Sequence, residues 1–271
     1  MALIAVVIIR PTGTSFMKKL PVLMSVPHGG LSIPLELADI VVLDEWEIFG
    51  EADAYTRDIY DLSASVRKWY DFDIARVFID LNRPPHTFPP EVTDGVIKDI
   101  TTYGVKIYKE GSGPGPELAG TLVKKYYKPY HDRLGEAMDD GIELGLDCHS
   151  MAAIAPPTAR DAGSERPLIC LGDVHGDTCP RETTTDFRKC LAEALDMDEK
   201  QISINRPFAG GHITRTYGSG KVPWIQIEIS RALYLDPPGS HPSAINGSDN
   251  GIVKLNKALE KALRLFFKQL T

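Results

Sequence analysis

The sequence predicts an α/β protein in which a mixed, mainly parallel sheet is covered by helices on both faces. The main observation is that strand-like and helix-like stretches alternate from residue 20 to the carboxyl end. Such alternation is typical of strand–helix units that build a sheet with helices on its two sides. The second observation is size and composition. The chain has 271 residues, 43% hydrophobic and 25% charged, which is enough to bury one large core.

The amino-terminal half is expected to contain two strands and one long helix. Residues 20–26 form a short apolar run typical of a buried strand. Residues 52–69 repeat apolar side chains every three or four positions, which predicts an amphipathic helix. Residues 74–81 are rich in β-branched side chains and predict a second strand. This strand should end before Pro84 and Pro85, because proline cannot donate to a ladder.

A long connection separates the two halves. Residues 84–117 are rich in Pro, Gly and Thr and are expected to form a surface excursion, either a functional lid or a linker. The expected helices after it are 118–138, 183–196 and 251–270, and the expected strands are 142–147, 167–172, 201–205, 210–216 and 223–230. No internal repeat and no dividing linker is visible, so residues 17–271 are expected to form a single catalytic domain.

The first 16 residues stand apart from this pattern. Residues 2–9 are continuously apolar but too short to span a bilayer, and they lack the basic stretch that precedes a secretory signal. Residues 1–16 are therefore interpreted either as an extra edge strand or as an extension that is not native. In the second case Met17 would be the natural start.

Charge and cysteine usage exclude several classes of partner. A net charge of −7 argues against a nucleic acid held by a general basic surface, although a local basic pocket for an acidic small molecule is compatible with it. No stretch of the sequence is typical of a membrane span. The four cysteines form no C-x-x-C pair, which favours reduced thiols in a cytoplasmic protein. Nothing in the sequence indicates an oligomeric state.

Two histidine motifs lie more than a hundred residues apart, and each follows a strand-like run. His28 lies in Ser-Val-Pro-His-Gly-Gly at 25–30, and His149 lies in Leu-Asp-Cys-His-Ser at 146–150. An imidazole at the carboxyl end of a strand lies where open α/β sheets bind ligands, and histidine is the commonest metal ligand. Two such histidines and a nearby carboxylate would make a catalytic zinc site with an open position.

Each motif also has a plainer interpretation. His28 could lie in a tight strand-to-helix turn, and His149 could be a buried histidine with satisfied hydrogen bonds. The His-Gly-Gly string also occurs in the oxyanion loop of serine hydrolases. That interpretation requires a G-x-S-x-G elbow, and the sequence has none.

The third metal ligand is expected to be a carboxylate at the start of the helix predicted after His28. Asp53 is the preferred residue and Glu51 is the reserve, and Asp58 stays open because one sequence does not fix the helix register. Acidic residues are also favoured in a first helical turn by the helix dipole alone.

Glu228 is the candidate general base. It lies in the strand predicted at 223–230, where Gln226, Glu228 and Ser230 alternate with isoleucines. This alternation is also ordinary for a half-exposed strand. A carboxylate at a strand end is nevertheless well suited to take a proton from water at a metal.

The two residues before His149 have different expected roles. In an extended strand Asp147 points to the same side as His149, so it could hydrogen-bond the imidazole as metal-bound histidines require. Cys148 points to the opposite face and is not expected to be a nucleophile.

Basic side chains near these motifs predict a negatively charged substrate. Arg76, Asn82 and Arg83 bracket the strand predicted at 74–81, and Arg215 follows a Gly-Gly pair. Arginine binds carboxylates through two parallel hydrogen bonds. An exposed arginine, or a salt bridge to a neighbouring aspartate, would explain each of these residues singly.

His131 ends the string Tyr-Tyr-Lys-Pro-Tyr-His at 126–131. The aromatic residues of this string are expected to pack a helix against the sheet. His131 is expected to make a polar contact to the substrate pocket.

In their order along the chain, these motifs resemble the N-formylglutamate amidohydrolase family, from residue 20 to about residue 234. The strings are S-V-P-H-G-G at 25–30, A-D-x-x-T-x-D-x-Y-D at 52–61, R-V-F-I-D-L-N-R at 76–83, Y-x-P-Y-H at 127–131, D-C-H-S at 147–150, L-G-D-V-H-G at 171–176, N-R-P-F-A-G-G-H-I-T-R at 205–215 and Q-I-E-I-S at 226–230. Any one string is unspecific, but the ordered set is difficult to obtain by chance.

The resemblance implies a zinc-exopeptidase-like, three-layer α/β/α domain and metal-dependent hydrolysis of an N-acyl amino acid. The namesake reaction converts N-formyl-L-glutamate to formate and L-glutamate in histidine degradation. The residues that the resemblance assigns are His28, Asp53 and His149 as ligands of one zinc ion, Glu228 as the base, and Arg83 and Arg215 as clamps on the substrate carboxylates. In that mechanism Arg76 is expected to stabilise the developing oxyanion.

Two other functions stay open at this point. One is a deacylase or peptidase that acts on a different N-acyl amino acid or on a short peptide. The other is a non-catalytic binder of an acidic metabolite, although such a protein would not need a base at position 228.

Overall fold

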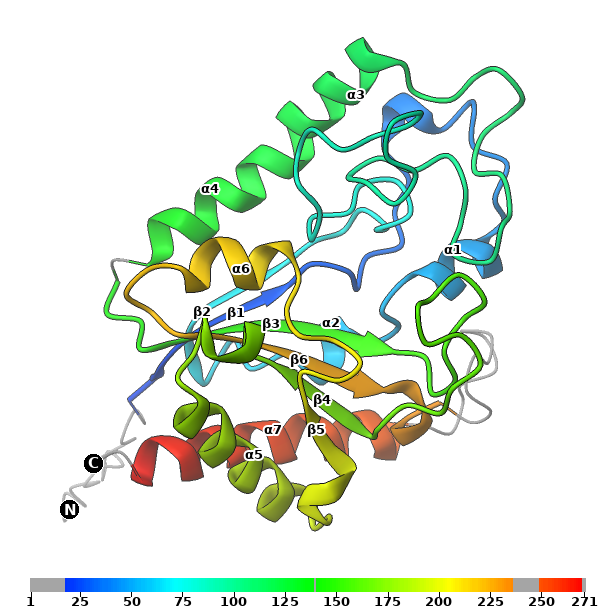
Figure 1. Ribbon diagram of the computed structural model, residues 1–271. Coiled ribbons are helices and arrows are strands. Elements are labelled where there is room, and N and C mark those ends of the chain that lie inside the picture. Colours follow the sequence, from blue (N-terminus) through cyan, green and yellow to red (C-terminus); the bar gives the residue numbers. More distant parts are fainter. Residues whose placement is uncertain (1–17, 139, 236–248, 270–271) are drawn as a thin grey trace, which may run out of the picture.

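The strands form one six-stranded sheet of mixed, mainly parallel topology (Figure 1). The computed structural model describes residues 18–138, 140–235 and 249–269. The strands are β1 (Leu20–Val26), β2 (Val66–Asp71), β3 (Leu144–Met151), β4 (Ile169–Gly172), β5 (Ile202–Ile204) and β6 (Trp224–Ser230). Their order across the sheet is β2-β1-β3-β6-β4-β5, and only the β4–β6 pairing is antiparallel. The predicted α/β class is confirmed.

Helices cover both faces of this sheet. The α-helices are α1 (Glu45–Glu51), α2 (Thr56–Ile59), α3 (Pro116–Leu122), α4 (Lys128–Ala137), α5 (Arg181–Leu195), α6 (His212–Gly218) and α7 (Asp249–Gln269), and a π-helical segment, Val123–Tyr127, joins α3 to α4. In Figure 1, α4 and α6 lie above the sheet and α5 and α7 below it. The chain therefore forms three layers. None of the described helices is long and apolar enough to cross a membrane.

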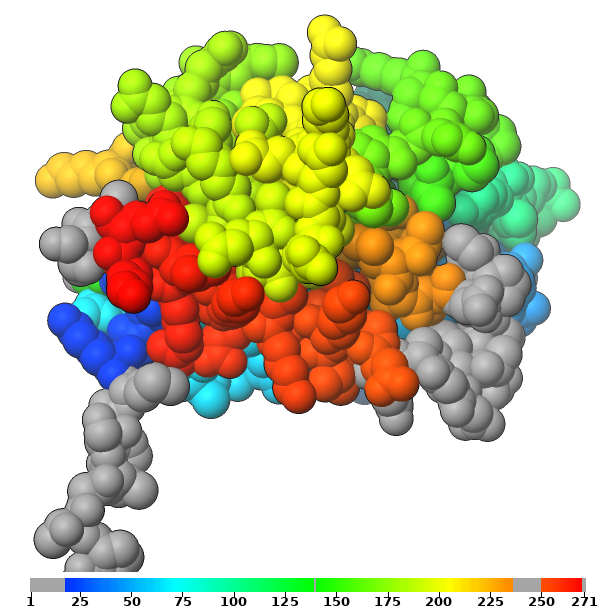
Figure 2. Space-filling view, turned by 90° about the horizontal axis from the view of Figure 1, so that it is seen from below, coloured from blue at the N-terminus to red at the C-terminus, as the bar shows by residue number. Residues whose placement is uncertain are grey.

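The lower layer is built by two long helices that pack beside each other. Figure 2 views this face, with α7 in orange and red next to α5 in yellow-green. Phe187 of α5 and Phe266 of α7 meet edge to face, with ring centroids 5.5 Å apart. Both helices bury their apolar sides in one core with Leu146 and Ile227 of the sheet.

The upper layer contains α3, α4, α6 and much of the chain between β2 and α3. Leu134 of α4 and Ile213 of α6 are buried there in one cluster with Trp224 of β6. The neighbouring strand carries Gly145, and a Cβ at this position would lie only 2.2 Å from the Trp224 ring. A glycine is therefore required for this close approach.

Several predicted elements are confirmed with shifted ends. The strand at 20–26 is β1, the strands near 142–147, 167–172, 201–205 and 223–230 are β3 to β6, and the helices at 183–196 and 251–270 are α5 and α7. The helix expected at 118–138 is present but is divided by the π-helical segment. The extension at 1–16 lies outside the described residues.

The helix predicted over 52–69 is wrong. Only α2 is helical there, because Tyr55 has a φ of 58° in the left-handed region and so stops the helix at its amino end. Further along, Val66 pairs with Leu20 of β1 and belongs to the edge strand β2. The apolar spacing that resembled a helix arises because residues such as Ile59 are buried in the core.

The strand predicted over 74–81 is also wrong. The amides of Phe78 and Ile79 both donate to the Ala75 carbonyl, at 3.0 and 3.3 Å, as in successive turns. The segment is buried above the sheet, where its apolar side chains join the upper core. Its β-branched composition therefore reflects burial without pairing in the sheet.

The strand predicted over 210–216 is a helix, α6. Gly210 has a φ of 132°, which favours glycine, and the chain turns there into the helix. The Ile213 amide, in the first turn, donates to Asn82 Oδ1 at 2.7 Å. A side chain from another segment thus satisfies an amide that the helix itself cannot pair.

The excursion predicted at 84–117 is only partly confirmed. Residues 84–115 contain no α-helix or extended strand, but they do not all lie at the surface. Val96, Ile97 and Ile107 are fully or almost fully buried, and Lys98 is 4% exposed. This segment therefore contributes to the upper core and also supplies a buried charge.

Candidate metal centre

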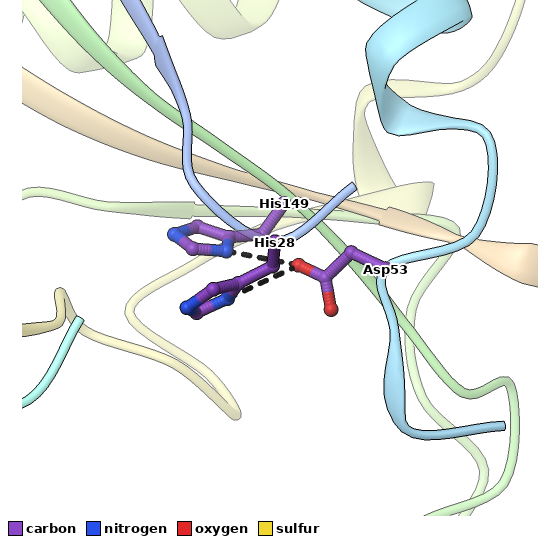
Figure 3. A group of neighbouring side chains, drawn as sticks. All are labelled: His28, Asp53 and His149. Atoms are coloured by element: carbon purple, nitrogen blue, oxygen red, sulfur yellow. Dashed lines mark hydrogen bonds and ion pairs between the residues drawn. The ribbon is translucent and has the colours of Figure 1, made fainter. Parts of the chain in front are cut away.

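Three segments bring His28, Asp53 and His149 together at the carboxyl ends of β1 and β3 (Figure 3). His28 follows β1 by two residues, Asp53 follows α1 by two, and His149 lies within β3. The Asp53 amide donates to the His28 carbonyl at 3.0 Å, which joins the first two segments. One side-chain nitrogen or oxygen of each residue lies within 4.8 Å of the other two, and all three side chains are buried.

The outer nitrogen of each imidazole is held by a carboxylate. His28 Nε2 lies 2.8 Å from Asp80 Oδ1, and His149 Nε2 lies 2.8 Å from Asp147 Oδ1, the contact expected from the sequence. A carboxylate accepts the Nε2 hydrogen of a neutral imidazole, so the lone pair is left on Nδ1. In the neutral form of each imidazole, which is the form that binds a metal, Nδ1 therefore faces Asp53 with its lone pair.

The inner nitrogens and Asp53 fit a divalent metal ion. His28 Nδ1 is buried without a hydrogen-bond partner among the described residues, and it lies 3.6 Å from Asp53 Oδ2. His149 Nδ1 lies 2.9 Å from the same oxygen. Two imidazole nitrogens and one carboxylate oxygen are a zinc donor set, and an unpaired buried nitrogen calls for a positively charged partner.

The charges around the three residues also favour a cation. Burial alone would lower the pKa of His149, but Asp147 and Asp53 raise it well above its usual value. Burial would likewise raise the pKa of Asp53, but Arg76 and the two histidines hold it well below the usual range. Carboxylates that attract a proton to an imidazole attract a metal cation to the same place.

Asp80 links His28 to two cations, the partly buried Arg76 and the buried Lys98. It accepts hydrogen bonds from Arg76 Nη2 at 3.0 Å and from Lys98 Nζ at 3.1 Å. Burial would raise the pKa of Asp80, but Arg76, His28 and Lys98 lower it well below its ordinary value. Asp80 therefore stays ionised beside His28. The sequence alone indicates no role for Asp80 at the site, because His28 and Lys98 lie far from it along the chain.

Glu228 lies beside His149 in the sheet, since the two residues are paired in the β3–β6 register. Its carboxylate accepts a hydrogen bond from Gln226 Nε2 at 2.8 Å and is 7% exposed. Burial raises the pKa of Glu228 to about 7. A carboxylate with this pKa can both take up and release a proton near neutral pH.

A cavity of about 690 Å³ opens above this group. Its walls include the three clustered residues, Glu228, Asn82 and six arginines, namely Arg76, Arg83, Arg160, Arg166, Arg215 and Arg231. The cavity therefore joins a candidate metal centre, an ionisable carboxylate and a strongly cationic wall. Such a combination suits an anionic substrate.

The predicted arginines lie in the cavity wall but differ in their partners. Arg76 donates to Asp53 Oδ1 at 3.1 Å and to Asp80, so its two terminal nitrogens are both engaged. Arg83 binds Asp94 Oδ2 at 2.7 Å. Arg215 donates from Nε to the Gly210 carbonyl at 3.1 Å. The oxyanion role expected for Arg76 stays a prediction.

Asn82 connects the first turn of α6 to the residues of β3 at the candidate metal centre. Its Oδ1 accepts from the Ile213 amide, and its Nδ2 lies 3.0 Å from His149 Nε2 and 3.3 Å from Asp147 Oδ2. Asn82 thus ties α6 to β3 beneath the cavity.

His131 does not line the cavity, contrary to expectation. Its Nε2 lies 2.9 Å from the Leu81 carbonyl and its Nδ1 lies 3.0 Å from Tyr217 Oη, while its ring stacks on Tyr127. Burial lowers the pKa of His131 to about 4, so the ring is neutral. Its Nδ1 thus joins α4 to α6 and its Nε2 joins α4 to the Leu81 carbonyl, so neither ring nitrogen is left for a substrate.

The alternatives to Asp53 are not part of the three-residue cluster, although Glu51 lines the same cavity. Glu51 accepts from the amide and hydroxyl of Thr102 at 2.8 and 2.9 Å, and Asp58 is exposed. Cys148 is buried in the lower core, on the face opposite His149, as expected.

Comparisons with known proteins agree with this geometry. Residues 20–235 match the profile of the N-formylglutamate amidohydrolase family. N-formylglutamate deformylases of Pseudomonas putida and Pseudomonas aeruginosa are 29% and 26% identical over 231 and 228 residues, and each alignment covers 80% of this chain and 83% of the relative. These lengths show that the similarity is not confined to the histidine motifs.

Two solved structures share the fold. The crystal structure of an N-formylglutamate amidohydrolase from Ralstonia eutropha superimposes with a TM-score of 0.70 at 22% identity, over 95% of each chain. A gene product of Agrobacterium tumefaciens superimposes with a TM-score of 0.65 at 15% identity, over 94% of this chain and 92% of the other. At such identities the likeness concerns the fold alone.

Proposed function

This chain belongs to the N-formylglutamate amidohydrolase family, and from that premise we propose that it hydrolyses N-formyl-L-glutamate to formate and L-glutamate with one divalent metal ion, zinc in the first instance. The reaction breaks a linear amide bond, as the names of the two Pseudomonas relatives indicate. The observation that carries the metal dependence is the buried, unpartnered Nδ1 of His28, which faces Asp53 beside the Nδ1 of His149.

In this proposal His28, Asp53 and His149 hold the metal ion, while Asp80 and Asp147 keep the two imidazoles oriented. A metal ion held there would supply Lewis acidity that lowers the pKa of water and polarises the formyl carbonyl. Everything else is done by the side chains of the protein.

Glu228 is proposed to move the proton. Its raised pKa of about 7 allows it to take a proton from the attacking water as the water oxygen bonds to the formyl carbon. It then gives this proton to the glutamate nitrogen as the C–N bond breaks. The products are formate and L-glutamate, and Glu228 returns to its ionised state.

The setting of the reaction is proposed as well. We assign it to one catalytic domain over residues 17–271 in the cytoplasm and to amino-acid degradation, where the namesake reaction completes the breakdown of histidine. All four cysteines are unpaired and buried, which suits a reducing compartment.

The experiment compares N-formyl-, N-acetyl- and N-succinyl-L-glutamate under zinc-replete conditions, with release of the acyl acid as the readout. We expect formate from the formyl compound and little product from the other two. Activity should fall after treatment with a chelator and return with zinc. Hydrolysis of another acyl compound with the formyl compound inert would refute the substrate. No hydrolysis at all by a zinc-loaded protein would favour a binding protein.

Metal analysis of His149→Ala tests the centre independently of turnover. We expect loss of bound zinc with unchanged circular dichroism. His86→Ala is the matched control, because His86 is exposed and does not line the cavity. Equal zinc content in both variants would remove His149 from the site.

A further inference from the structure

The six arginines in the cavity wall differ in whether a carboxylate neutralises them. Arg76 is paired with Asp53 and Asp80, and Arg83 is paired with Asp94. These two guanidinium groups therefore already have carboxylate partners. A substrate carboxylate would have to compete with a protein carboxylate for either of them.

Arg166 is satisfied in a similar way. It makes two parallel hydrogen bonds to Asp161, both 2.9 Å long, and lies over the Phe208 ring with its Cζ 4.9 Å from the ring centroid. Asp161, which follows Arg160 in the sequence, is therefore already paired with Arg166. Within residues 18–138, 140–235 and 249–269, no carboxylate pairs with Arg160.

Arg231 and Arg215 also lack a carboxylate partner within the described part of the chain. The terminal nitrogens of Arg231 donate to the carbonyls of Gly50 and Ala52, so they are used in holding the chain that leads to the metal centre. Arg215 differs, because only its Nε is used, in a bond to Gly210. Arg160 and Arg215 thus present guanidinium nitrogens to the cavity that no protein group occupies in the described residues.

These two arginines line the cavity from different segments of the chain. Arg215 lies in α6, two residues after Ile213, whose amide is bonded to Asn82, and Asn82 contacts His149. Arg215 Nε donates to the Gly210 carbonyl, and the next amide, that of Gly211, donates to Gln226, whose Nε2 donates to Glu228. Arg215 therefore lies on the side of the cavity that carries Glu228. Arg160 lies nine residues after the end of β3, in the segment that also brings Arg166 to the cavity.

N-formyl-L-glutamate carries two carboxylates at different distances from the reacting bond. Its α-carboxylate is bonded to the carbon that bears the scissile nitrogen, whereas its side-chain carboxylate lies further from the reacting bond. Resting on the function proposed above, we propose that Arg215 binds the α-carboxylate and that Arg160 binds the side-chain carboxylate. Arg160 is then the residue that selects an acidic amino acid, and Arg83, bound to Asp94, is not a clamp.

The test compares N-formyl-L-glutamate with N-formyl-L-glutamine, which has nearly the same shape but no side-chain charge. Arg160→Gln should lower kcat/KM for the glutamate compound by about 10- to 100-fold, the usual worth of a charge-assisted hydrogen bond. It should change kcat/KM for the glutamine compound by less than about twofold. Arg215→Gln should lower both values together. Arg181→Gln, an exposed arginine of α5, is the control and should change neither.

Equilibrium binding keeps this inference separate from the proposed reaction. Calorimetric titration of the same two ligands into Glu228→Gln protein, with and without Arg160→Gln, measures the preference for the charged ligand without turnover. A preference that disappears with Arg160→Gln supports the inference even if the wild type hydrolyses neither compound. An unchanged preference overturns it even if hydrolysis proceeds, and a preference lost in Arg83→Gln alone would return the clamp to Arg83.

Discussion

Asp80 connects the candidate metal centre to two cations, the partly buried Arg76 and the buried Lys98, so its substitution tests geometry and electrostatics together. One carboxylate oxygen accepts from His28 Nε2 at 2.8 Å and from the Asn82 amide at 2.9 Å. The other accepts from Arg76 Nη2 at 3.0 Å and from Lys98 Nζ at 3.1 Å. The variant Asp80→Asn keeps the shape of this side chain but removes its charge and one of its two acceptor oxygens.

The cost in stability follows from the partners that remain. Removing one member of a buried ion pair costs about 3–5 kcal/mol when the other charge is left alone. Here Arg76 keeps Asp53 and Lys98 keeps Asp94, at 3.1 Å in each case. Because neither cation is left without a carboxylate, we expect Asp80→Asn to lower the free energy of unfolding by about 2–3 kcal/mol, just below that range.

The cost in metal affinity follows from the orientation of His28. An asparagine cannot accept from His28 with the same strength while it also faces two cations, so the imidazole loses its fixed direction. Loss of such an outer partner usually costs about 10- to 100-fold in metal affinity. Asp147→Asn is the matched variant, because Asp147 holds His149 in the same way but accepts its other hydrogen bonds from the neutral Thr214 and Asn82.

Two measurements separate these effects. Urea unfolding in the presence of a chelator gives the stability of the metal-free protein, and competition with a chromophoric chelator gives the zinc affinity. We expect both variants to bind zinc less tightly and Asp80→Asn to be the less stable of the two. Wild-type zinc affinity in Asp80→Asn would refute the assignment of His28 Nδ1 as a ligand. Equal loss of stability in the two variants would refute the ion-pair argument.

Further predictions concern the base, the core and the first histidine motif. Only ionised Glu228 can accept a proton, so kcat/KM should fall as the pH drops below the pKa of Glu228. That pKa is about 7 in the absence of a cation, and a bound cation lowers it. Glu228→Gln should lower kcat by about 10²- to 10⁴-fold with full zinc content, and retained activity in formate-release assays would exclude this base. Burial raises the pKa of the Cys148 thiol well above its usual value, so iodoacetamide at pH 8 should leave it unmodified in native protein by mass spectrometry, and rapid labelling would contradict its burial. A Cβ on Gly30 would lie 2.2 Å from the Asp73 carbonyl oxygen, so Gly30→Ala should destabilise the protein by about 1–3 kcal/mol in urea unfolding. Gly29→Ala, which meets side-chain atoms first, should cost less, and the reverse order would refute this packing argument.

The sequence by itself determined the fold class and the positions of the main strands. β1 is a short, largely apolar run, and β3 and β6 alternate apolar residues with the polar side chains of the site; all three strands are almost entirely buried. The histidine motifs could be recognised for a related reason. His28 and His149 lie at the ends of these strands, and parallel strands end at one edge of the sheet.

The sequence pattern predicted the wrong secondary structure for two segments that pack in the upper layer. Residues 74–81 look like a strand because they are apolar and β-branched, but they lie above the sheet with no strand beside them. Residues 210–216 look like a strand but form α6, whose first turn depends on an oxygen of Asn82, 131 positions earlier in the chain. Local composition records that a residue is buried, but not what it is buried against.

Only the tertiary structure decided how charges are paired around the candidate site. The sequence indicates that Asp53, Arg76, Arg83 and Arg215 are close to the chemistry, but it cannot say which of them already have partners. Contacts between segments far apart in the chain decide that Asp80 binds His28 and Lys98. They also decide which arginines of the cavity have no carboxylate partner among the residues that the structure describes. The physical reason is that an ion pair acts over a few ångströms in space and leaves no periodic trace along the sequence.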